Sequence, residues 1–461
     1  MTPSLVREFQ AICGKDHVWE DPVDRTAYSY DAAVLDSVVP ALVVRPSSQE
    51  ILGQVVACCN RNGIPMTVRG AGTNLSGGTI PDSRGVVVLT NALNRIVEIN
   101  EADMYAVVEP GVVTARFAAA VEQKGLFYPP DPGSQAVSTL GGNVAENAGG
   151  LRGLKYGVTK DYVMGLHFFD VNGELIKTGS RTVKCATGYN LGALLVGSEG
   201  TLGVFSQIIL KLIPIPRHRK SMMAVFPTMR AASETVAAII AAHVVPATLE
   251  IMDQFTIQAV EGFSRVGLPL DAAALLLIEV DGHPAQVEDE AAQVEAICNK
   301  YGADRVRVAS TAAERDGVWA ARRSALSALA KLKPTLVLED ATVPRSRIPE
   351  MIAALEEIAR THRLTIGTFG HAGDGNLHPT ILTDRRDPEE WKRVEAGIEA
   401  IFDRALALGG TLSGEHGTGI AKAKFLIRET SPGTILYSKR IRSALDPKGI
   451  LNPGKIIGAG S

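Results

Sequence analysis

Between residues 40 and 215, short apolar runs alternate with turns rich in glycine. The runs occupy residues 41–46, 64–70, 85–90, 105–111, 163–179 and 203–216. Each is short, rich in β-branched residues and bounded by Gly, Pro or polar residues, which predicts strands. Residues 47–63 instead carry apolar positions at helical spacing, opening on Ser47 or Ser48 and ending at Gly63, which predicts a helix. Asn172-Gly173 between alternating apolar positions predicts a hairpin. Because strands and helices are interspersed without regular βαβ repeats, we expect this part to be an α+β domain.

The pattern changes after a linker-like stretch at 214–220. Alanine-rich helical segments at 229–244, 284–302 and 347–362 alternate with strand-like segments at 274–282, 364–373 and 378–383. This alternation predicts an antiparallel sheet with helices on one face. The C-terminal residues predict a helical tail that ends in Pro/Gly turns. We therefore expect three parts, at 1–217, 218–420 and 421–461.

Composition and charge exclude several classes of protein. Hydrophobic residues make up 46% and charged residues 21% of 461 positions, which is typical of a globular protein with two or three domains. A net charge of −3 gives no basic field for nucleic acid. No apolar run is long enough to span a bilayer and no secretory signal opens the chain, so we expect a cytoplasmic protein. The five cysteines have irregular spacing, which indicates neither a disulfide framework nor an iron–sulfur site.

Three glycine-rich loops predict a site for a long phosphorylated ligand. They occupy residues 68–78, 138–163 and 197–204. The first begins like a dinucleotide fingerprint, but Leu75 stands at the third glycine position and no helix is predicted to follow, so NAD is disfavoured. Glycine allows positive φ and close backbone approach, so successive N–H groups can bind an anion.

These loops, with "YGVTKDYV" and the terminal "LNPGK", resemble the FAD-binding domain of the vanillyl-alcohol oxidase superfamily. The most similar branch contains D-lactate dehydrogenase, the FAD subunit of glycolate oxidase and D-2-hydroxyglutarate dehydrogenase. The resemblance implies a two-part FAD-binding domain plus a cap domain whose antiparallel sheet is covered by helices. Because the first loop has Asn74 and no histidine, we expect non-covalent FAD. The implied cofactor-binding residues are Arg69, Gly70, Gly72, Thr73, Asn74, Ser76, Gly77, Ser138, Gly141, Gly142, Asn147, Gly149, Glu199, Gly203, Val204 and Asn452.

Two histidines in "HAGDGNLHPT", residues 371–380, form a candidate metal site. If Asp374-Gly375 is a two-residue turn, His371 lies directly opposite His378. Their Cβ atoms would then be about 4.5–5.5 Å apart, a separation that lets two imidazoles bind one divalent ion.

"SGEHGTG", residues 413–419, offers Glu415 as a third ligand. The flanking glycines permit an irregular backbone, so Glu415 and His416 could reach one cavity. Two histidines and a carboxylate fit Zn²⁺, Mn²⁺ or Fe²⁺ and do not distinguish among them. By the resemblance, His371, His378 and Glu415 are the metal ligands and His416 is the catalytic base.

A substrate carboxylate also needs a cation. Arg322 and Arg323 stand in "GVWAARRSALSALAKLK", at the expected start of a helix, where a solvent-exposed role is the alternative. The resemblance points to Arg322.

The expected activity is oxidation of a small D-2-hydroxy acid to the 2-oxo acid, with D-lactate ahead of glycolate. In this hypothesis flavin N5 takes the hydride and the metal and His416 activate the hydroxyl. Without internal electron carriers, the chain is expected to pass electrons to a separate acceptor, such as an electron-transferring flavoprotein or an iron–sulfur subunit. D-2-hydroxyglutarate dehydrogenase, an electron-relay flavoprotein subunit and a flavin-free metallohydrolase are the alternatives. The sequence leaves open the substrate, metal, acceptor and oligomeric state.

Overall fold

A computed structural model describes residues 1–458 and divides the chain into two compact units. The first unit comprises Met1–Gly149, Val158–Ile215 and Glu415–Ser461, and the second comprises Gly150–Gly157 and Pro216–Gly414. The division therefore falls at 215/216 and 414/415, where the sequence predicted 217/218 and 420/421. The expected tail, 421–461, groups with the first unit, and its last three residues lie outside the described part of the chain.

One short segment groups with the second unit although the sequence predicted it within the first. It contains α6 (Gly153–Tyr156). Lys155 Nζ donates to Asp281 Oδ1 at 2.7 Å, and the Tyr156 hydroxyl donates to Asp281 Oδ2 at 2.7 Å. A buried carboxylate with two such partners fixes α6 to β14 (Ala274–Gly282), a strand of the second unit.

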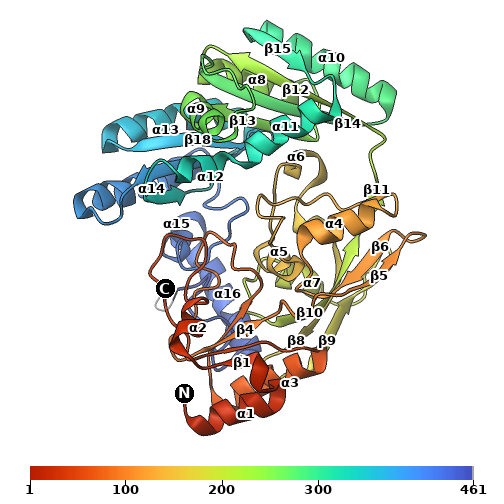
Figure 1. The fold of residues 1–461 in the computed structure, drawn as a ribbon, viewed down its shortest axis with the longest axis vertical. Coiled ribbons are helices and arrows are strands. Elements are labelled where there is room, and N and C mark those ends of the chain that lie inside the picture. The colour runs from red at the N-terminus through yellow and green to blue at the C-terminus, as the bar shows by residue number, and fades with distance from the viewer. Residues whose placement is uncertain (459–461) are drawn as a thin grey trace. The chain divides into compact units, whose positions relative to one another are not determined.

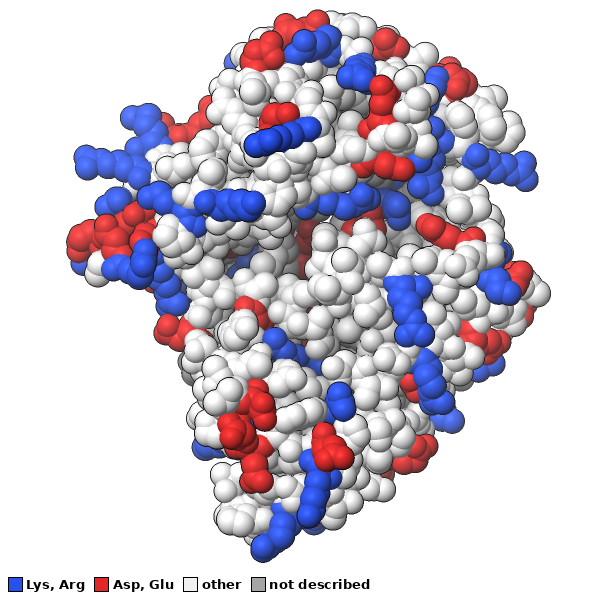
Figure 2. Space-filling model, in the orientation of Figure 1, with Lys and Arg blue, Asp and Glu red and all other residues white. Residues whose placement is uncertain are grey.

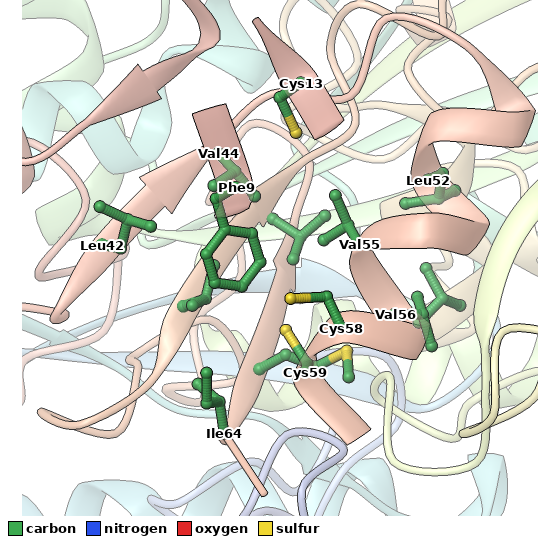
Figure 3. Packing of buried hydrophobic residues seen from close by; sticks show 14 of the residues in the cluster. Phe9, Cys13, Leu42, Val44, Leu52, Val55, Val56, Cys58, Cys59 and Ile64 are labelled. Carbon is green, nitrogen blue, oxygen red and sulfur yellow. The ribbon is translucent and has the colours of Figure 1, made fainter. Parts of the chain in front are cut away.

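The first unit contains a four-stranded sheet in the order β1-β2-β4-β3. Its strands are β1 (Val18–Trp19), β2 (Leu42–Val44), β3 (Met66–Arg69) and β4 (Val86–Leu89). The predicted helix is α3 (Gln49–Asn62), where the Ser48 hydroxyl accepts from the Ile51 N–H and Gly63 ends the helix with φ +62°. Helix α1 (Pro3–Cys13) packs against α3, and Phe9 with Cys13, Cys58 and Cys59 lies in the buried core between helices and sheet (Figure 3).

A five-stranded antiparallel sheet completes the core of the first unit, in the order β5-β6-β10-β8-β9. Its strands are β5 (Ile96–Asn100), β6 (Tyr105–Val108), β8 (Val163–Phe169), β9 (Leu175–Gly179) and β10 (Val204–Lys211). The predicted hairpin forms between β8 and β9, with Phe169 paired to Leu175, so its loop is five residues long. Gly173 adopts φ +81° in this loop.

The remaining elements of the first unit are short or peripheral. They are η1 (Lys15–His17), α2 (Pro22–Thr26), α4 (Thr114–Glu122), β7 (Leu126–Phe127), α5 (Leu140–Glu146), η2 (Thr159–Asp161), α7 (Leu191–Leu195), β11 (Ile213–Pro214), η4 (Ala423–Phe425), α15 (Leu426–Glu429) and α16 (Pro432–Leu445).

The second unit is built on an eight-stranded antiparallel sheet (Figure 1). The order is β15-β12-β14-β13-β18-β19-β16, and β17 also pairs with β19. The strands are β12 (His218–Phe226), β13 (Thr248–Asp253), β14, β15 (Arg305–Val308), β16 (Thr335–Leu338), β17 (Ala341–Thr342), β18 (Thr365–His371) and β19 (Asn376–Thr383). The expected linker at 214–220 therefore already contains the start of β12.

Helices cover both faces of this sheet, so the expectation of helices on one face was wrong. Leu275 and Leu277 of β14 pack in a cluster with residues of α9 (Gln254–Ser264), α11 (Ala312–Arg323) and α12 (Ala325–Ala330). Leu276 and Ile278, which point the other way, are also fully buried, and α8 (Met229–Ala241) and α10 (Pro284–Lys300) both pack against β14. The continuous apolar run of β14 is the sequence signal for burial on both faces.

The other elements of the second unit are η3 (Arg345–Arg347), α13 (Ile348–His362) and α14 (Pro388–Ala407). Helices α13 and α14 pack side by side (Figure 1). No helix within residues 1–458 is long and apolar enough to cross a membrane. Basic and acidic side chains are interspersed on the face drawn in Figure 2, as expected from 47 Lys and Arg against 50 Asp and Glu.

Candidate active site

The first glycine loop follows β3 without a helix, as the sequence predicted. The Arg69 guanidinium turns back on the loop and donates to the Tyr30 carbonyl at 2.7 Å and to the Thr79 hydroxyl at 3.2 Å. Gly72, at φ +69°, lies against this guanidinium, and a Cβ there would come within 2.2 Å of Arg69 Nη2. Arg69 therefore shapes the loop, and Gly72 allows the side chain to pass beneath it.

Asn452 joins the first and third loops. Its amide nitrogen donates to the carbonyls of Gly78 at 2.8 Å and Glu199 at 2.7 Å, and its amide oxygen accepts from the Thr67 hydroxyl at 3.1 Å. Lys455 lies nearby, almost fully buried, and donates to the Ile80 carbonyl. Burial lowers the pKa of Lys455 to about 8. The C-terminal segment thus closes over two of the predicted cofactor loops within the first unit.

The second loop contains a buried polar network at the start of α5. Thr139 caps the helix by accepting from the Gly142 N–H at 3.3 Å. The hydroxyls of Ser138 and Thr114 lie 2.9 Å apart, and Asn143 Nδ2 donates to the Thr114 hydroxyl at 2.8 Å. These bonds fix the backbone of the loop that contains predicted residues Ser138 and Gly142.

Two buried carboxylates, Glu146 and Glu199, lie next to the segment that follows His416. Glu199 accepts from the N–H groups of Thr418 at 2.6 Å and Gly419 at 2.8 Å. A Cβ at Gly417 would lie 2.3 Å from Glu146 Oε2 and 3.0 Å from Glu199 Oε1. Burial raises the pKa of Glu199 to about 7, and burial together with the Glu199 charge holds the pKa of Glu146 well above its usual range. Sequence analysis did not single out Glu146.

Unpartnered buried polar atoms in all three loops fit a polar ligand. Asn74 Nδ2, Ser76 Oγ, Glu146 Oε2 and Ser198 Oγ are buried and have no hydrogen-bond partner among residues 1–458. Burying such groups without partners is unfavourable, so a ligand with several hydrogen-bonding groups suits this region. The loops therefore fit the FAD that the sequence resemblance implies.

Several other predicted cofactor residues make contacts within the protein itself. Asn147 Oδ1 accepts from the Lys160 N–H at 2.9 Å. Gly203 packs against Phe168, and Val204 begins β10 opposite Phe169. The rest, Gly70, Thr73, Gly77, Gly141 and Gly149, lie in the first unit, in or beside the same loops.

The histidine hairpin forms in the second unit, with a different register from the predicted one. His371 pairs with Asn376 and His378 pairs with Phe369, so the loop contains four residues instead of two. The prediction that His371 faces His378 directly was therefore wrong. The shift is two residues, however, which returns both side chains to the same face. The two imidazoles lie as diagonal neighbours with ring centroids 5.0 Å apart and planes at 90°, and both are buried.

Glu250 on β13 lies beside His371. Met252 pairs with Phe369, so the same register places Glu250 opposite His371. His371 Nδ1 and Glu250 Oε1 are 2.7 Å apart, and the Arg322 guanidinium lies 2.5 Å from Glu250 Oε2. Burial alone would raise the pKa of Glu250, but the charges of Arg322 and His371 hold it below its usual value.

Arg322 lies in the last turn of α11, so its expected position at a helix start was wrong. The helix begins earlier because the Thr311 hydroxyl accepts from the Glu314 N–H and caps it. Arg322 is 5% exposed and stacks over Phe369 at 4.7 Å, which excludes a solvent-exposed role. Arg323, the neighbouring candidate, is exposed.

Asp340 fixes the backbone that leads to Glu415. Its Oδ2 accepts from the Ser413 hydroxyl at 2.9 Å and the Gly414 N–H at 2.8 Å, while Oδ1 lies 4.0 Å from His378 Nδ1. Glu415 and His416 follow in the chain and group with the first unit. Neither Glu250 nor Asp340 was predicted. A lone carboxylate inside the apolar stretch "TLEIM" was the available signal for Glu250.

Two family models match the chain. "FAD binding domain" matches residues 40–179, and "FAD linked oxidases, C-terminal domain" matches residues 215–456. The chain is 47% identical over 456 residues to glycolate oxidase subunit GlcD of Bacillus subtilis, covering 99% of this chain and 97% of that protein. It is 33% identical over 466 residues to D-lactate dehydrogenase of Anaerostipes hadrus, covering 99% and 98%.

Solved structures support the fold. The structure of p-cresol methylhydroxylase superposes with a TM-score of 0.82 at 18% identity, covering 99% of this chain and 96% of that one. The fold class predicted from the sequence is thereby confirmed, as is FAD as the cofactor. The chain is an FAD-dependent oxidoreductase and belongs to the FAD-linked oxidases, in the 2-hydroxy-acid dehydrogenase branch of the vanillyl-alcohol oxidase superfamily.

Proposed function

We propose that the protein oxidises a small 2-hydroxy monocarboxylate to the 2-oxo acid, with glycolate and D-lactate as the two leading substrates. One observation carries the proposal: two buried imidazoles and a buried guanidinium occupy the same face of one sheet, within an FAD-linked oxidase. The relative named for glycolate oxidation is 47% identical to this chain, and the relative named for D-lactate is 33% identical. We therefore place glycolate ahead of D-lactate, which reverses the order inferred from the sequence.

In this proposal His371, His378 and Glu415 hold one divalent ion, which is Zn²⁺, Mn²⁺ or Fe²⁺. The paired imidazoles fit such an ion because they are buried neighbours on one face. Glu415 directly follows Gly414, whose N–H is bound by Asp340, so the backbone entering Glu415 is fixed. Two nitrogen ligands and one carboxylate leave coordination positions open for a substrate.

FAD is held without a covalent bond, since the first loop has no histidine. The sixteen residues identified from the resemblance are the proposed contacts, and the unpartnered Asn74 Nδ2 and Ser76 Oγ are the most direct candidates. When bound, the flavin supplies the hydride acceptor and the metal lowers the pKa of the substrate hydroxyl.

His416 accepts the hydroxyl proton as general base, the role that a histidine side chain most often has in enzymes. The hydrogen bonds from Thr418 and Gly419 to Glu199 hold the backbone just after it. Arg322 orients the substrate carboxylate through the part of its guanidinium that Glu250 does not occupy. Electrons then leave to a separate acceptor protein, a role supported by the word "subunit" in the name of the Bacillus subtilis relative.

The test is anaerobic mixing of the purified protein with glycolate, D-lactate, L-lactate and D-2-hydroxyglutarate, followed by flavin absorbance. We expect glycolate or D-lactate to bleach the flavin, with D-2-hydroxyglutarate much slower because its second carboxylate would need a second cation besides Arg322. The His378→Ala variant, assayed at equal flavin content, is the matched control and should not bleach. Flavin that none of these acids reduces would favour an electron-relay subunit and refute the proposal.

A further inference from the structure

Glu250 is shared by two side chains of the candidate site. It is fully buried, with one carboxylate oxygen 2.7 Å from His371 Nδ1 and the other 2.5 Å from the Arg322 guanidinium. Neither the sequence resemblance nor the proposed function gives Glu250 a role. A buried carboxylate is costly to desolvate, so its position between these two groups requires an explanation.

The surrounding sheet and helix fix all three side chains. Strand β13 lies between β14 and β18, so the backbone that carries Glu250 is held by strand pairing on both sides. Arg322 is held from its other face by the ring of Phe369. Helix α11, which carries Arg322, is anchored by Trp319, whose indole N–H donates to Glu279 at 3.0 Å and lies 3.2 Å from the Ser221 hydroxyl.

The contact with His371 has a chemical consequence. A carboxylate accepts a hydrogen bond from Nδ1–H, which leaves Nε2 of the same ring as the atom with a lone pair for a metal. A carboxylate behind a metal-binding histidine also fixes the ring orientation and increases ligand basicity. The contact with Arg322 holds the planar guanidinium in one orientation and offsets its charge in a buried place.

We propose that Glu250 is a positioning residue that acts on metal and substrate together. Through His371 it presents Nε2 to the metal, and through Arg322 it orients the guanidinium that meets the substrate carboxylate. The inference rests on the proposed function, because it takes His371 as a metal ligand and Arg322 as the substrate cation.

The test measures metal affinity separately from turnover. Full-length holoprotein is stripped of metal, and Zn²⁺ and Mn²⁺ dissociation constants are obtained by competition with a chromogenic chelator. For Glu250→Gln we expect affinity to fall about 10–100-fold. The KM for glycolate or D-lactate should rise, while kcat at saturating metal and substrate changes much less.

Three further variants separate positioning from general damage. Glu279→Gln is the matched control, because Glu279 is a buried carboxylate on the same face that bonds Trp319 and Ser221 instead of a histidine. It should leave metal affinity unchanged even if it lowers the melting temperature. Glu250→Leu combined with Arg322→Met removes the stranded guanidinium and replaces the pair with apolar groups, which keeps a folded protein available. Its metal affinity should stay below that of Arg322→Met alone.

The outcomes distinguish this inference from the proposed function. If His378→Ala loses metal but both Glu250 variants bind it like the wild type, the inference is wrong and the metal site stands. If the double variant regains wild-type affinity, Glu250 acts only through Arg322, and its positioning of His371 is refuted. If the wild type binds metal no better than His378→Ala, the metal site and this inference both fail.

Discussion

His371 and His378 lie on one face of the sheet as diagonal neighbours, with ring centroids 5.0 Å apart, although neither residue is paired with the other. The loop between their strands determines this relationship. Gly375 adopts φ +92°, and a Cβ there would lie 2.1 Å from the Val343 carbonyl oxygen. The turn therefore depends on glycine for both conformation and space.

Gly375→Ala should destabilise the second unit and disturb the paired histidines. We expect a loss of about 1–3 kcal/mol in the free energy of unfolding, because the strained conformation and the backbone clash cannot both be relieved. Denaturant unfolding and bound metal per chain measure the effect. Gly262→Ala, in α9 with no atom near the added Cβ, is the control; it should leave bound metal unchanged and should raise the free energy of unfolding by up to about 1 kcal/mol, as expected for alanine in a helix. Wild-type stability in Gly375→Ala would contradict this account of the loop.

His378→Ala and His416→Ala should both lose activity, but for different reasons. Without His378, metal and activity are lost together, because one of two imidazole ligands is missing. Without His416, flavin and metal remain but turnover falls about 10²–10⁴-fold, as expected for a missing general base. Metal analysis, flavin absorbance and steady-state kinetics on the same preparations separate the two. Near-wild-type turnover in His416→Ala would refute its role as base.

The sequence predicted elements and same-face residues better than it predicted registers. Ser48 and Gly63 bounded their helix correctly because capping and left-handed termini are local effects. The Asp374-Gly375 turn was predicted too short, since a four-residue loop fits the same residues and the choice depends on packing of Gly375 against the Val343 carbonyl. His371 and His378 still lie on one face because the predicted loop and the observed loop both contain an even number of residues.

The neighbours of the site were harder to predict because they come from distant segments. Glu250 meets His371 across a β13–β18 pair separated by more than a hundred positions, which no local pattern encodes. The resemblance pointed to Arg322, which the structure buries, yet its expected place at a helix start was wrong because Thr311 caps that helix earlier in the chain. Family motifs point to candidate ligand-binding residues. The side chains that orient those residues, such as Glu250, become visible only in the folded structure.

Cys185 should be the only thiol in the native protein that reacts rapidly. It is exposed, and hydrogen bonding from the Thr187 backbone lowers its pKa. The other four are buried, and burial raises the pKa of Cys58 to about 11 and of Cys13 to about 12, so little thiolate forms at neutral pH. Titration with a disulfide reagent should give one fast equivalent, which Cys185→Ser removes. A fast equivalent that survives in that variant would contradict the burial of the others.

Asp253 should make stability depend on pH in the weakly acidic range. The residue caps α9, accepting from the Thr256 N–H at 2.7 Å, and its second oxygen accepts from the Thr368 N–H on β18 at 2.7 Å. Burial nevertheless raises its pKa from 3.8 to about 6. The folded state therefore binds this proton more tightly than the unfolded state does. The resulting contribution of Asp253 to the free energy of unfolding is present below pH 3.8 and is lost as pH rises through about 6.

The comparison of wild type with Asp253→Asn isolates this contribution, since the asparagine side chain does not titrate. As pH rises from about 4 to 6, the free energy of unfolding of the wild type should fall relative to the variant by about 2 kcal/mol, and the difference should be constant above about pH 7. Denaturant unfolding across this range measures both curves. The control is Asp384→Asn, a half-buried carboxylate whose pKa is lowered by hydrogen bonds from Arg386, so its difference curve should change in the opposite direction and chiefly below about pH 4. A flat difference for Asp253→Asn would show that its two N–H donors offset burial, so that its pKa is the same in the folded and unfolded states.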